Sequence, residues 1–255
     1  MPAHPPTRFS CNNPTAATRE LLALAPRFAS PVRMLRRLAL ALLFSLASTA
    51  ATAQEFIAVP DMISDEDFYR LVACAAPPGG TCTKPLIRWP EARRQDLRIG
   101  IADVAPSFPG YKLDLVDRAI DTAIAEINAT GAALRLRRVY EGTVDIPLYL
   151  VATPQGARIT GTSIAELDGS EMAIARVALR SRGGTILSAA IAISQEIRRR
   201  EIASVVLEEL VQALGLPTDI DSPAYTRSIF SEADNATVWL RGQDAAALRR
   251  HYPSR

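Results

Sequence analysis

The sequence predicts an α+β protein, in which helices pack on a mixed β-sheet. Three observations lead to this class. Segments with strand and helix periodicity follow one another as a strand, a helix, four strands, a long helix, an irregular segment and a last helix. The apolar residues of the long helix cover a wide arc, which predicts a mostly buried helix. The part of the chain that contains these elements has no internal repeat or low-complexity tract.

Residues 34–53 have the features of a secretory signal peptide. Two arginines precede an apolar run over 38–46, which is too short to span a bilayer, and the small residues 51–53 form a cleavage site. We therefore expect a periplasmic or secreted protein with no membrane span after removal of the signal. Residues 1–33 are rich in Pro, Ala and Thr. We expect them to be a mis-called or disordered extension before a true start at Met34.

The charge of the chain changes sign when the signal peptide is removed. Cleavage would leave residues 54–255, which are 202 residues (255 − 53), enough for one domain with a core and a small appendage. The first 53 residues carry six Arg and one Glu, so the formal net charge falls from +2 to −3. A net negative chain without a basic patch is not expected to bind nucleic acid.

Residues 54–90 predict a short helix followed by a stapled loop. Ser64 is a suitable N-cap, and three acidic residues follow it where the helix dipole favours them. Cys74 and Cys82 are an even pair close in sequence, which in an exported protein favours a disulfide over two free thiols. We expect this segment to brace a main domain over 91–255.

The main domain is expected to begin with a strand over 97–104, after the polar linker 91–96. Apolar residues at helical spacing then predict a helix over 113–131 that ends at a glycine. Two strands follow, over 134–141 and 145–153. The proline near the start of the second favours an edge strand or a strand-start position.

The second half of the domain is expected to contain two more strands and the long helix. Residues 171–180 favour a strand, although a helix is possible, and 183–194 favour a turn and then a strand. The long helix is predicted over 194–214, with Ser194 as its N-cap and Gly215 after its end. A last helix over 242–252 closes the domain.

Polar residues recur on one stripe of the long helix. Glu201, Ser204, Glu208 and Gln212 are spaced by three or four residues, and Glu209 lies about 100° around the helix axis from its neighbour. Three interpretations follow: an ordinary polar surface stripe, a buried hydrogen-bonded network, or a site. In a site, adjacent carboxyl groups in a dry cleft would suit general acid/base chemistry or a hard cation.

The histidine count argues against a zinc site. The chain has two histidines, His4 and His251, and the first lies in the predicted extension. Catalytic zinc usually takes several nitrogen or sulfur ligands, which one histidine cannot supply. We expect His251 to be a surface residue, and we expect no metal and no cofactor.

Three motifs resemble the matrixin-like metzincins, a class of zinc metalloproteases. "LEELVQALGLPTD", residues 207–219, follows their helix pattern H-E-x-x-H-x-x-G except at the histidines. "RSIF" gives Ser228-Ile229-Phe230 where that class has a Ser-Ile-Met turn below the metal, and a helix ending at Tyr252 closes the domain. The strand "GGTILSAAIAIS" looks like the strand along their substrate cleft. The combination resembles more closely the bacterial family called domain of unknown function 2927, and it implies a zincin-like fold without its zinc-binding histidines.

The resemblance assigns positions to individual residues. Glu209 matches the general-base Glu of an active metzincin, while Glu208 and Gln212 match its first two histidine ligands. The third ligand position falls at Thr218, beside Asp219. Phe230 matches the methionine of the turn. Glu208, Gln212, Asp219 and Phe230 are therefore the expected cleft residues, and Glu209 is the candidate catalytic residue.

Two functions remain open at this point. The first is an exported envelope protein that acts as a non-catalytic binding or structural module, with an envelope protein, a peptide or a cell-wall component as partner. The second is a peptidase-like or cell-wall-directed hydrolase that uses Glu209 as general base, with a metal other than zinc or with none. In a third interpretation the carboxyl groups are only structural.

Overall fold

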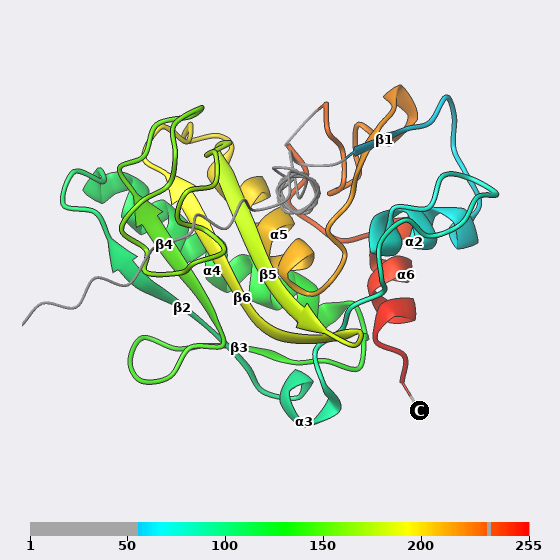
Figure 1. The fold of residues 1–255 in the computed structure, drawn as a ribbon, viewed down its shortest axis with the longest axis horizontal. Helices are drawn as coiled ribbons and strands as arrows, with labels where there is room; N and C mark the ends of the chain where they lie inside the picture. Colours follow the sequence, from blue (N-terminus) through cyan, green and yellow to red (C-terminus); the bar gives the residue numbers. More distant parts are fainter. Residues whose placement is uncertain (1–55, 234–235, 255) are drawn as a thin grey trace, which may run out of the picture. The chain divides into compact units, whose positions relative to one another are not determined.

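The main β-sheet has five strands, four of them parallel. The computed structural model describes residues 56–233 and 236–254, so the predicted extension and signal peptide lie outside the described residues. The strand order is β3-β2-β4-β6-β5, and β5 alone runs antiparallel to its neighbour (Figure 1). The prediction of a mixed sheet is confirmed. The strands are β2 (Leu97–Val104), β3 (Leu136–Arg138), β4 (Ile146–Val151), β5 (Ala175–Arg182) and β6 (Thr185–Ser194).

Strands β5 and β6 form a hairpin that ends the sheet. Gly183 and Gly184, the two residues between the strands, both have positive φ, as the favoured two-residue hairpin turns require. The hairpin makes β5 the edge strand and places β6 between β4 and β5. The segment "GGTILSAAIAIS", which contains β6, therefore lies inside the sheet, and the two edge strands of the sheet are β3 and β5.

Side chains of β6 alternate between two apolar clusters, one on each face of the sheet. Ile191 and Ile193 belong to the main core, whereas Ala190 and Ala192 pack against the segment that follows β4. Because both faces are covered, the strand reads as a nearly continuous apolar run. This explains why its existence could be predicted although its place in the sheet could not.

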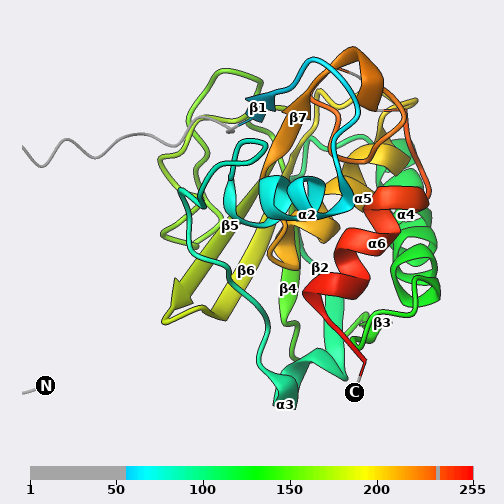
Figure 2. The same cartoon turned by 90° about the vertical axis from the view of Figure 1, so that its right-hand side faces the viewer.

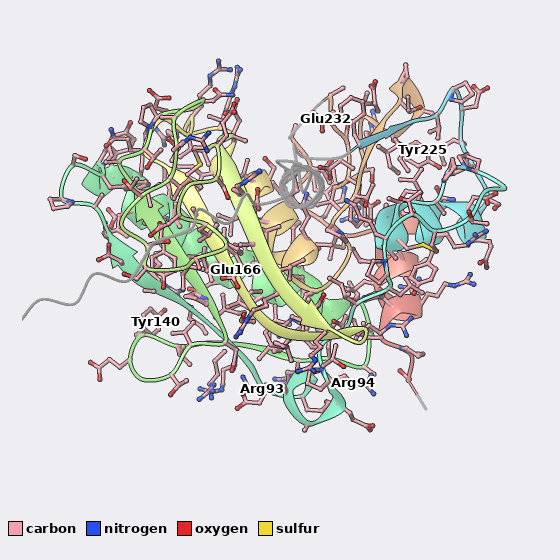
Figure 3. All side chains as sticks on the ribbon, in the orientation of Figure 1. Arg93, Arg94, Tyr140, Glu166, Tyr225 and Glu232 are labelled. Carbon is pink, nitrogen blue, oxygen red and sulfur yellow. A yellow bond between two sulfur atoms is a disulfide. The ribbon has the colours of Figure 1, made fainter. Side chains whose placement is uncertain are left out.

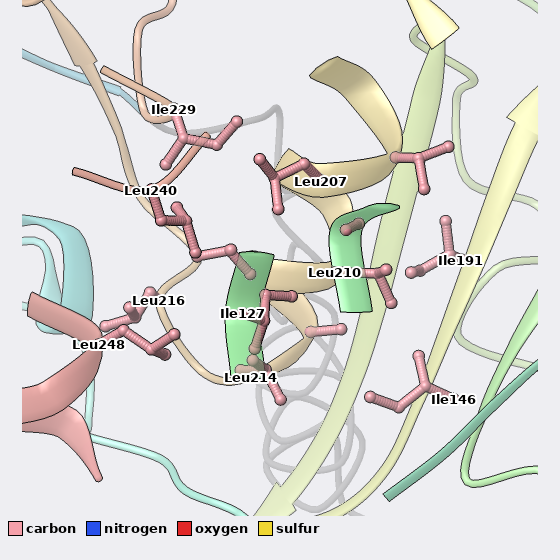
Figure 4. Close-up of a cluster of buried hydrophobic side chains, with 14 of the residues drawn as sticks. Ile127, Ile146, Ile191, Leu207, Leu210, Leu214, Leu216, Ile229, Leu240 and Leu248 are labelled. Atoms are coloured by element: carbon pink, nitrogen blue, oxygen red, sulfur yellow. The ribbon is translucent and has the colours of Figure 1, made fainter. Parts of the chain in front are cut away.

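Helices α4 (Gly110–Ala129) and α5 (Ile202–Ala213) pack on each other over one face of the sheet (Figure 2). Figure 4 shows Leu207 and Leu210 of α5 meeting Ile127 of α4 and Ile191 of β6. Burial of these side chains removes apolar surface from water, at roughly 25 cal/mol for each Å². The core thus fixes α5 firmly between the sheet and α4.

The predicted start of α5 is wrong. The predicted helix covers 194–214, whereas α5 covers Ile202–Ala213. Ser194 remains in the sheet, because its N–H donates to the Ile174 carbonyl (2.9 Å). Its Oγ accepts from the N–H of Glu196 (3.1 Å), which makes a local turn that competes with helix formation.

The carboxyl end of α5 is closed by side chains that are distant in sequence. The indole Nε1 of Trp89 donates to the Ala213 carbonyl (3.0 Å), and the Tyr252 hydroxyl donates to the Leu214 carbonyl (2.6 Å). These bonds satisfy carbonyl groups that have no partner within the helix. Gly215 follows with φ +97°, the left-handed conformation predicted after the helix end.

Helix α2 (Asp65–Cys74) packs on α6 (Gly242–His251), so the amino-terminal segment does brace the domain. The predicted N-cap is confirmed, because Ser64 Oγ accepts from the N–H of Asp67 (3.1 Å). The predicted disulfide is also confirmed: Cys74 and Cys82 are bonded, with their Cα atoms 5.1 Å apart. Within the described residues, no helix is long and apolar enough to cross a membrane.

Several shorter elements differ from the prediction. A short helix, α3 (Glu91–Arg94), replaces most of the expected linker. The segment expected to be irregular contains a strand, β7 (Asp219–Asp221), which pairs in parallel with β1 (Phe56–Ala58). A 3-10 turn, η1 (Pro223–Tyr225), follows. Pro147 is the second residue of β4, so it does lie at a strand start, but β4 is internal and the edge alternative is wrong.

Candidate functional site

Helix α5 carries three polar side chains into the interior. Glu208, Glu209 and Gln212 each expose only 4% of their surface, because α5 is covered by α4, by the sheet and by the segment that contains β7. An ordinary polar surface stripe is therefore excluded. Burial of three such groups is costly unless they are paired or neutral, so their partners decide what the cluster does.

Gln212 and Asp219 are bonded to each other. The amide Nε2 of Gln212 donates to both carboxylate oxygens of Asp219, at 3.1 and 3.3 Å. Asp219 is fully buried in β7, and β7 is held in place by its pairing with β1. The structure thus brings together two of the predicted cleft residues, and it joins them as a buried network.

Glu209, on the same helix, has one unpaired carboxyl oxygen. Its Oε2 atom is buried and has no hydrogen-bond partner among the described residues. Burial, helped by the nearby charge of Asp219 and opposed by Arg176 of β5, raises the pKa of Glu209 to about 8. Glu209 is therefore mostly protonated at neutral pH.

Glu208 has a similar environment. Burial raises its pKa well above the ordinary value, and the charges of Asp219, Glu209 and Glu232 raise it further. Its carboxyl group has no hydrogen bond to another described residue. Glu208 and Glu209 are thus adjacent buried residues of α5 whose pKa values are both raised.

Two buried hydroxyl groups along β7 also have no hydrogen-bond partner among the described residues. They are Thr218 Oγ1, immediately before the strand, and Ser231 Oγ, whose residue bridges Ile220. Buried polar atoms are usually paired, so an unpaired group points to a water, a ligand or a reactive role. The region around β7 therefore has more hydrogen-bonding capacity than the described residues use.

The Ser228-Ile229-Phe230 turn is anchored by α6. The Ser228 hydroxyl and the Ile229 N–H both donate to the buried carboxylate of Asp244, at 2.6 and 2.9 Å. Burial raises the pKa of Asp244 to about 6 even though these hydrogen bonds lower it. Phe230 packs edge-on against Phe68 of α2, with the ring centroids 5.9 Å apart. The ring of Phe230 is therefore part of the core between the turn and the amino-terminal brace.

His251 is buried, so its predicted surface position is wrong. Its Nε2 atom lies 2.9 Å from the Ile87 carbonyl and its Nδ1 atom lies 3.3 Å from the Tyr69 hydroxyl. Burial and the nearby guanidinium of Arg88 lower its pKa to about 3, so the imidazole is neutral. The helix on which it lies packs on α2, which explains why a residue near the carboxyl end is enclosed.

The residues that the sequence resemblance aligns with zinc ligands do not fit zinc. Glu208, Gln212 and Thr218 offer only oxygen and amide donors, and the amide of Gln212 is bonded to Asp219. No group of three or more His, Cys, Asp or Glu within the described residues is arranged to hold a metal ion.

A groove of about 480 Å³ opens near the amino end of α5. It lies where β4 and β6 end and β5 begins, and the segment after β7 forms its other side. Figure 3 shows Glu232 on this segment, at the opposite end of the sheet from Arg93 and Arg94 of α3. The lining residues are Gln155, Ile174, Glu196, Arg198, Glu201, Val205, Glu232 and Ala233.

The acids of the groove differ in how far they are neutralised. Glu201 forms ion pairs with Arg198 (3.3 Å) and Arg200 (3.7 Å). Glu196 accepts a hydrogen bond from the N–H of Gln155 (2.8 Å). The carboxyl group of Glu232 has no hydrogen-bond or ion-pair partner among the described residues, although its backbone N–H donates to the Ile220 carbonyl (3.0 Å). Its pKa is raised by partial burial and then by the charge of Asp221.

Sequence reasoning found the helix residues of this region but missed the groove. Glu201 lies on the predicted polar stripe, but Glu196 and Glu232 lie on loops separated by the whole of α5 and β7. Only the fold brings them together. The charged residues 196–201 were the one feature of the sequence that could have indicated this region. They do not indicate which other segments lie next to them.

Residues 72–255 match the protein family described as "Protein of unknown function (DUF2927)". No curated protein matches the chain. The matched region contains the whole sheet, α5, the turn before α6 and α6 itself.

Proposed function

The chain belongs to the DUF2927 family, whose description assigns no activity, and from this premise we propose that it is an exported, non-catalytic binding module with a zincin-like fold and no zinc site. Three features support the fold: a mixed sheet with one antiparallel edge strand, a buried helix α5, and a turn anchored by the last helix. These elements follow one another in the order that the resemblance implies.

The observation that carries the proposal is the bond between Gln212 and Asp219. In a zincin-like arrangement, Gln212 takes the place of a zinc ligand and Asp219 stands beside another. Here the two side chains satisfy each other. A region that would hold a metal in a protease thus closes the interior of this protein.

Export of the protein is supported by the sequence signal over 34–53 and by the disulfide between Cys74 and Cys82. Disulfides persist in oxidising compartments such as the periplasm and are rare in the cytosol. We propose a periplasmic or secreted location. Mass spectrometry of the protein recovered from a host periplasm should find an amino terminus at Gln54; a chain that keeps residues 34–53 would contradict the signal.

Metal analysis tests the loss of the zinc site. Protein purified from full-chain expression is expected to hold zinc only far below one equivalent. A gain-of-function variant tests the zincin-like frame: Glu208→His, Gln212→His and Thr218→His together are expected to confer zinc binding, because they restore three nitrogen ligands. Near-stoichiometric, tightly held zinc in the wild type would contradict the proposal, and a folded triple variant that binds no zinc would contradict the frame.

A hydrolase with Glu209 as catalytic residue is the second candidate, favoured by the unpartnered Oε2 atom of that residue. Two facts weigh against it. A carboxyl group with a pKa of about 8 is mostly protonated at neutral pH, so only a minor fraction of the molecules would hold it in the base form. Glu209 also does not line the groove. If a peptide or cell-wall hydrolysis is found, Glu209→Gln should leave it unchanged; loss of that activity with the fold retained would establish the hydrolase.

A further inference from the structure

We propose that Asp244 makes the turn 228–230 a pH-sensitive latch, which is held closed against α6 in acid and opens more readily at neutral and alkaline pH. The inference goes beyond the proposed function, because it concerns the mobility of one segment and names no ligand. It stands or falls independently of the zinc site.

The carboxyl group of Asp244 is enclosed between α6 and the turn. Asp244 lies in the first turn of α6 and exposes only 5% of its surface. The Ser228 hydroxyl donates to one of its carboxyl oxygens (2.6 Å), and the Ile229 N–H donates to the other (2.9 Å). A single side chain thus ties the turn directly to the last helix.

The same turn positions the segment that runs along β7. The Phe230 carbonyl accepts from the N–H of Ile220 (2.7 Å), and the Glu232 N–H donates to the Ile220 carbonyl (3.0 Å). Glu232 in turn lies on one side of the groove near the amino end of α5 (Figure 3). Opening of the turn would therefore loosen the pairing along β7 and one side of the groove.

Asp244 lacks a compensating positive charge. A buried carboxylate needs a cation or enough hydrogen-bond donors to offset its loss of water. Asp244 has the two donors of the turn and, among the described residues, no ion-pair partner. Burial therefore outweighs the two hydrogen bonds and raises the pKa of Asp244 to about 6. In an open turn the carboxyl group reaches water and regains its ordinary pKa of 3.8.

The other charged and titratable groups around α6 do not replace the missing cation. Burial raises the pKa of Tyr225 in η1 above its ordinary value of 10, so its hydroxyl stays neutral over this range of pH. The charged side chains of α6 itself, Arg249, Arg250 and His251, lie at its opposite end. Those of the surrounding segments have other environments: Asp65 bonds to Gln243, Glu66 pairs with Arg250, Glu126 accepts from Leu240, Arg241 lies over the ring of Trp239, and Arg227 is exposed.

The direction of the switch follows from the two pKa values of Asp244. The closed state binds the proton more tightly than the open state, so acid favours the closed turn and a rise in pH through 6 favours opening. With a pKa of about 6 when closed and 3.8 when open, the ratio of open to closed molecules should rise about tenfold between pH 5 and pH 7.5.

Amide hydrogen exchange of the full-chain protein, followed by NMR at these two pH values and corrected for intrinsic exchange rates, tests the latch. The amide of Ile229 should lose about tenfold in protection at the higher pH. The amide of Leu148 in the central strand β4 should stay more protected at both pH values, because the opening is local. Asp244→Asn should abolish the loss, and Asp61→Asn, at an exposed residue before α2, should retain it. Ser228→Ala should enlarge the loss, since it removes a hydrogen bond that lowers the pKa of Asp244.

Three results would overturn the inference: equal protection of Ile229 at the two pH values, the wild-type loss in Asp244→Asn, or exchange of Leu148 as fast as that of Ile229. Absence of the loss in Asp61→Asn would also contradict it. If Asp244→Asn does not fold, Ser228→Ala decides, because an unchanged or smaller loss in that variant is incompatible with the latch. Metal content is measured separately, so failure of the latch would leave the zinc-free module standing.

Discussion

At the scale of single residues, the carboxyl groups of α5 make the stability of the protein depend on pH. Glu209 has a pKa of about 8 in the folded protein and about 4.5 when unfolded. Between these values the folded state binds one more proton than the unfolded state, so stability falls as pH rises. Glu208, whose pKa is also raised, acts in the same direction.

His251 has the opposite effect at lower pH. Its folded pKa of about 3 lies below the ordinary 6.5, so between these values the unfolded state binds the extra proton and stability rises with pH. Asp244, with a folded pKa of about 6 raised from 3.8, opposes this rise over the acidic part of the range. Above pH 6.5 the contribution of His251 is complete, and the carboxyl groups of α5 dominate.

Urea unfolding at pH 6.5 and pH 8 measures the effect. The free energy of unfolding should fall by about 1.4 kcal/mol per pH unit for each group that titrates. Glu209→Gln, which is neutral in both states, should show a smaller fall. Equal stability of the wild type at the two pH values would mean that Glu209 is ionised in the folded protein.

At the scale of elements, the best-defined junction is the carboxyl end of α5, where Trp89 and Tyr252 contact the helix. The Tyr252 hydroxyl donates to the Leu214 carbonyl and accepts from the N–H of Trp89 (3.1 Å). Tyr252→Phe removes both bonds and leaves buried backbone groups unpaired, so we expect a loss of about 1–3 kcal/mol in urea unfolding. Tyr140→Phe, at a side chain that is 72% exposed, should change stability by less than about 0.5 kcal/mol. Similar losses in the two variants would show that the hydroxyl of Tyr252 does not stabilise this junction.

Gly215 at the same junction cannot be replaced. A Cβ atom there would lie 2.2 Å from the Ile87 carbonyl oxygen and 2.9 Å from His251 Nε2, at a φ of +97°. Gly215→Ala should therefore lower the free energy of unfolding by more than about 2 kcal/mol. Thermal unfolding would record this as a clearly lower midpoint. Gly110→Ala, in open space at the start of α4, is the matched control and should be nearly neutral or stabilising. A tolerated alanine at 215 would require the backbone around Ile87 to move.

The helices and strands also show which features of the fold hydrophobic periodicity can predict. Periodicity located β2 and α6 closely, because each presents one regular apolar face to the core. It extended α5 by eight residues at its start, because Ser194 is a good N-cap by type but is held in the sheet. Pairings between distant segments, such as β1 with β7, leave no periodic signal in either segment.

For the candidate site, the sequence predicted which polar residues of the helix share a stripe, but not which residues they bond to. The spacing of Glu208 and Gln212 predicted one shared stripe, and burial of both follows from the wide apolar arc of the helix. The partner of Gln212 lies on β7, after a turn whose direction no local rule fixes. The groove required the loops after β4 and β6 to converge, which is a property of the whole sheet.

At the scale of the whole molecule, the disulfide fastens the amino-terminal brace. Cys74 and Cys82 close a short loop after α2, the helix that packs on α6. Replacing both by serine should cost about 2–3 kcal/mol of unfolding free energy, as expected for a loop of this length. Reductant should destabilise the wild type by the same amount and leave the double variant unchanged. An effect of reductant on the double variant would point to another cause.

The hydrogen bonds that close the carboxyl end of α5 come from residues at opposite ends of the domain, so they can form only late in synthesis of the chain. Trp89 and Tyr252 are 163 residues apart, yet together they close one end of the central helix. Translation must therefore pass residue 252 before that helix acquires its last bonds, and such distant contacts form slowly. Until residue 252 has been made, the carboxyl end of α5 lacks the hydrogen bond from Tyr252. For the exported protein that we propose, such late closure of α5 would suit passage through a channel before folding is complete.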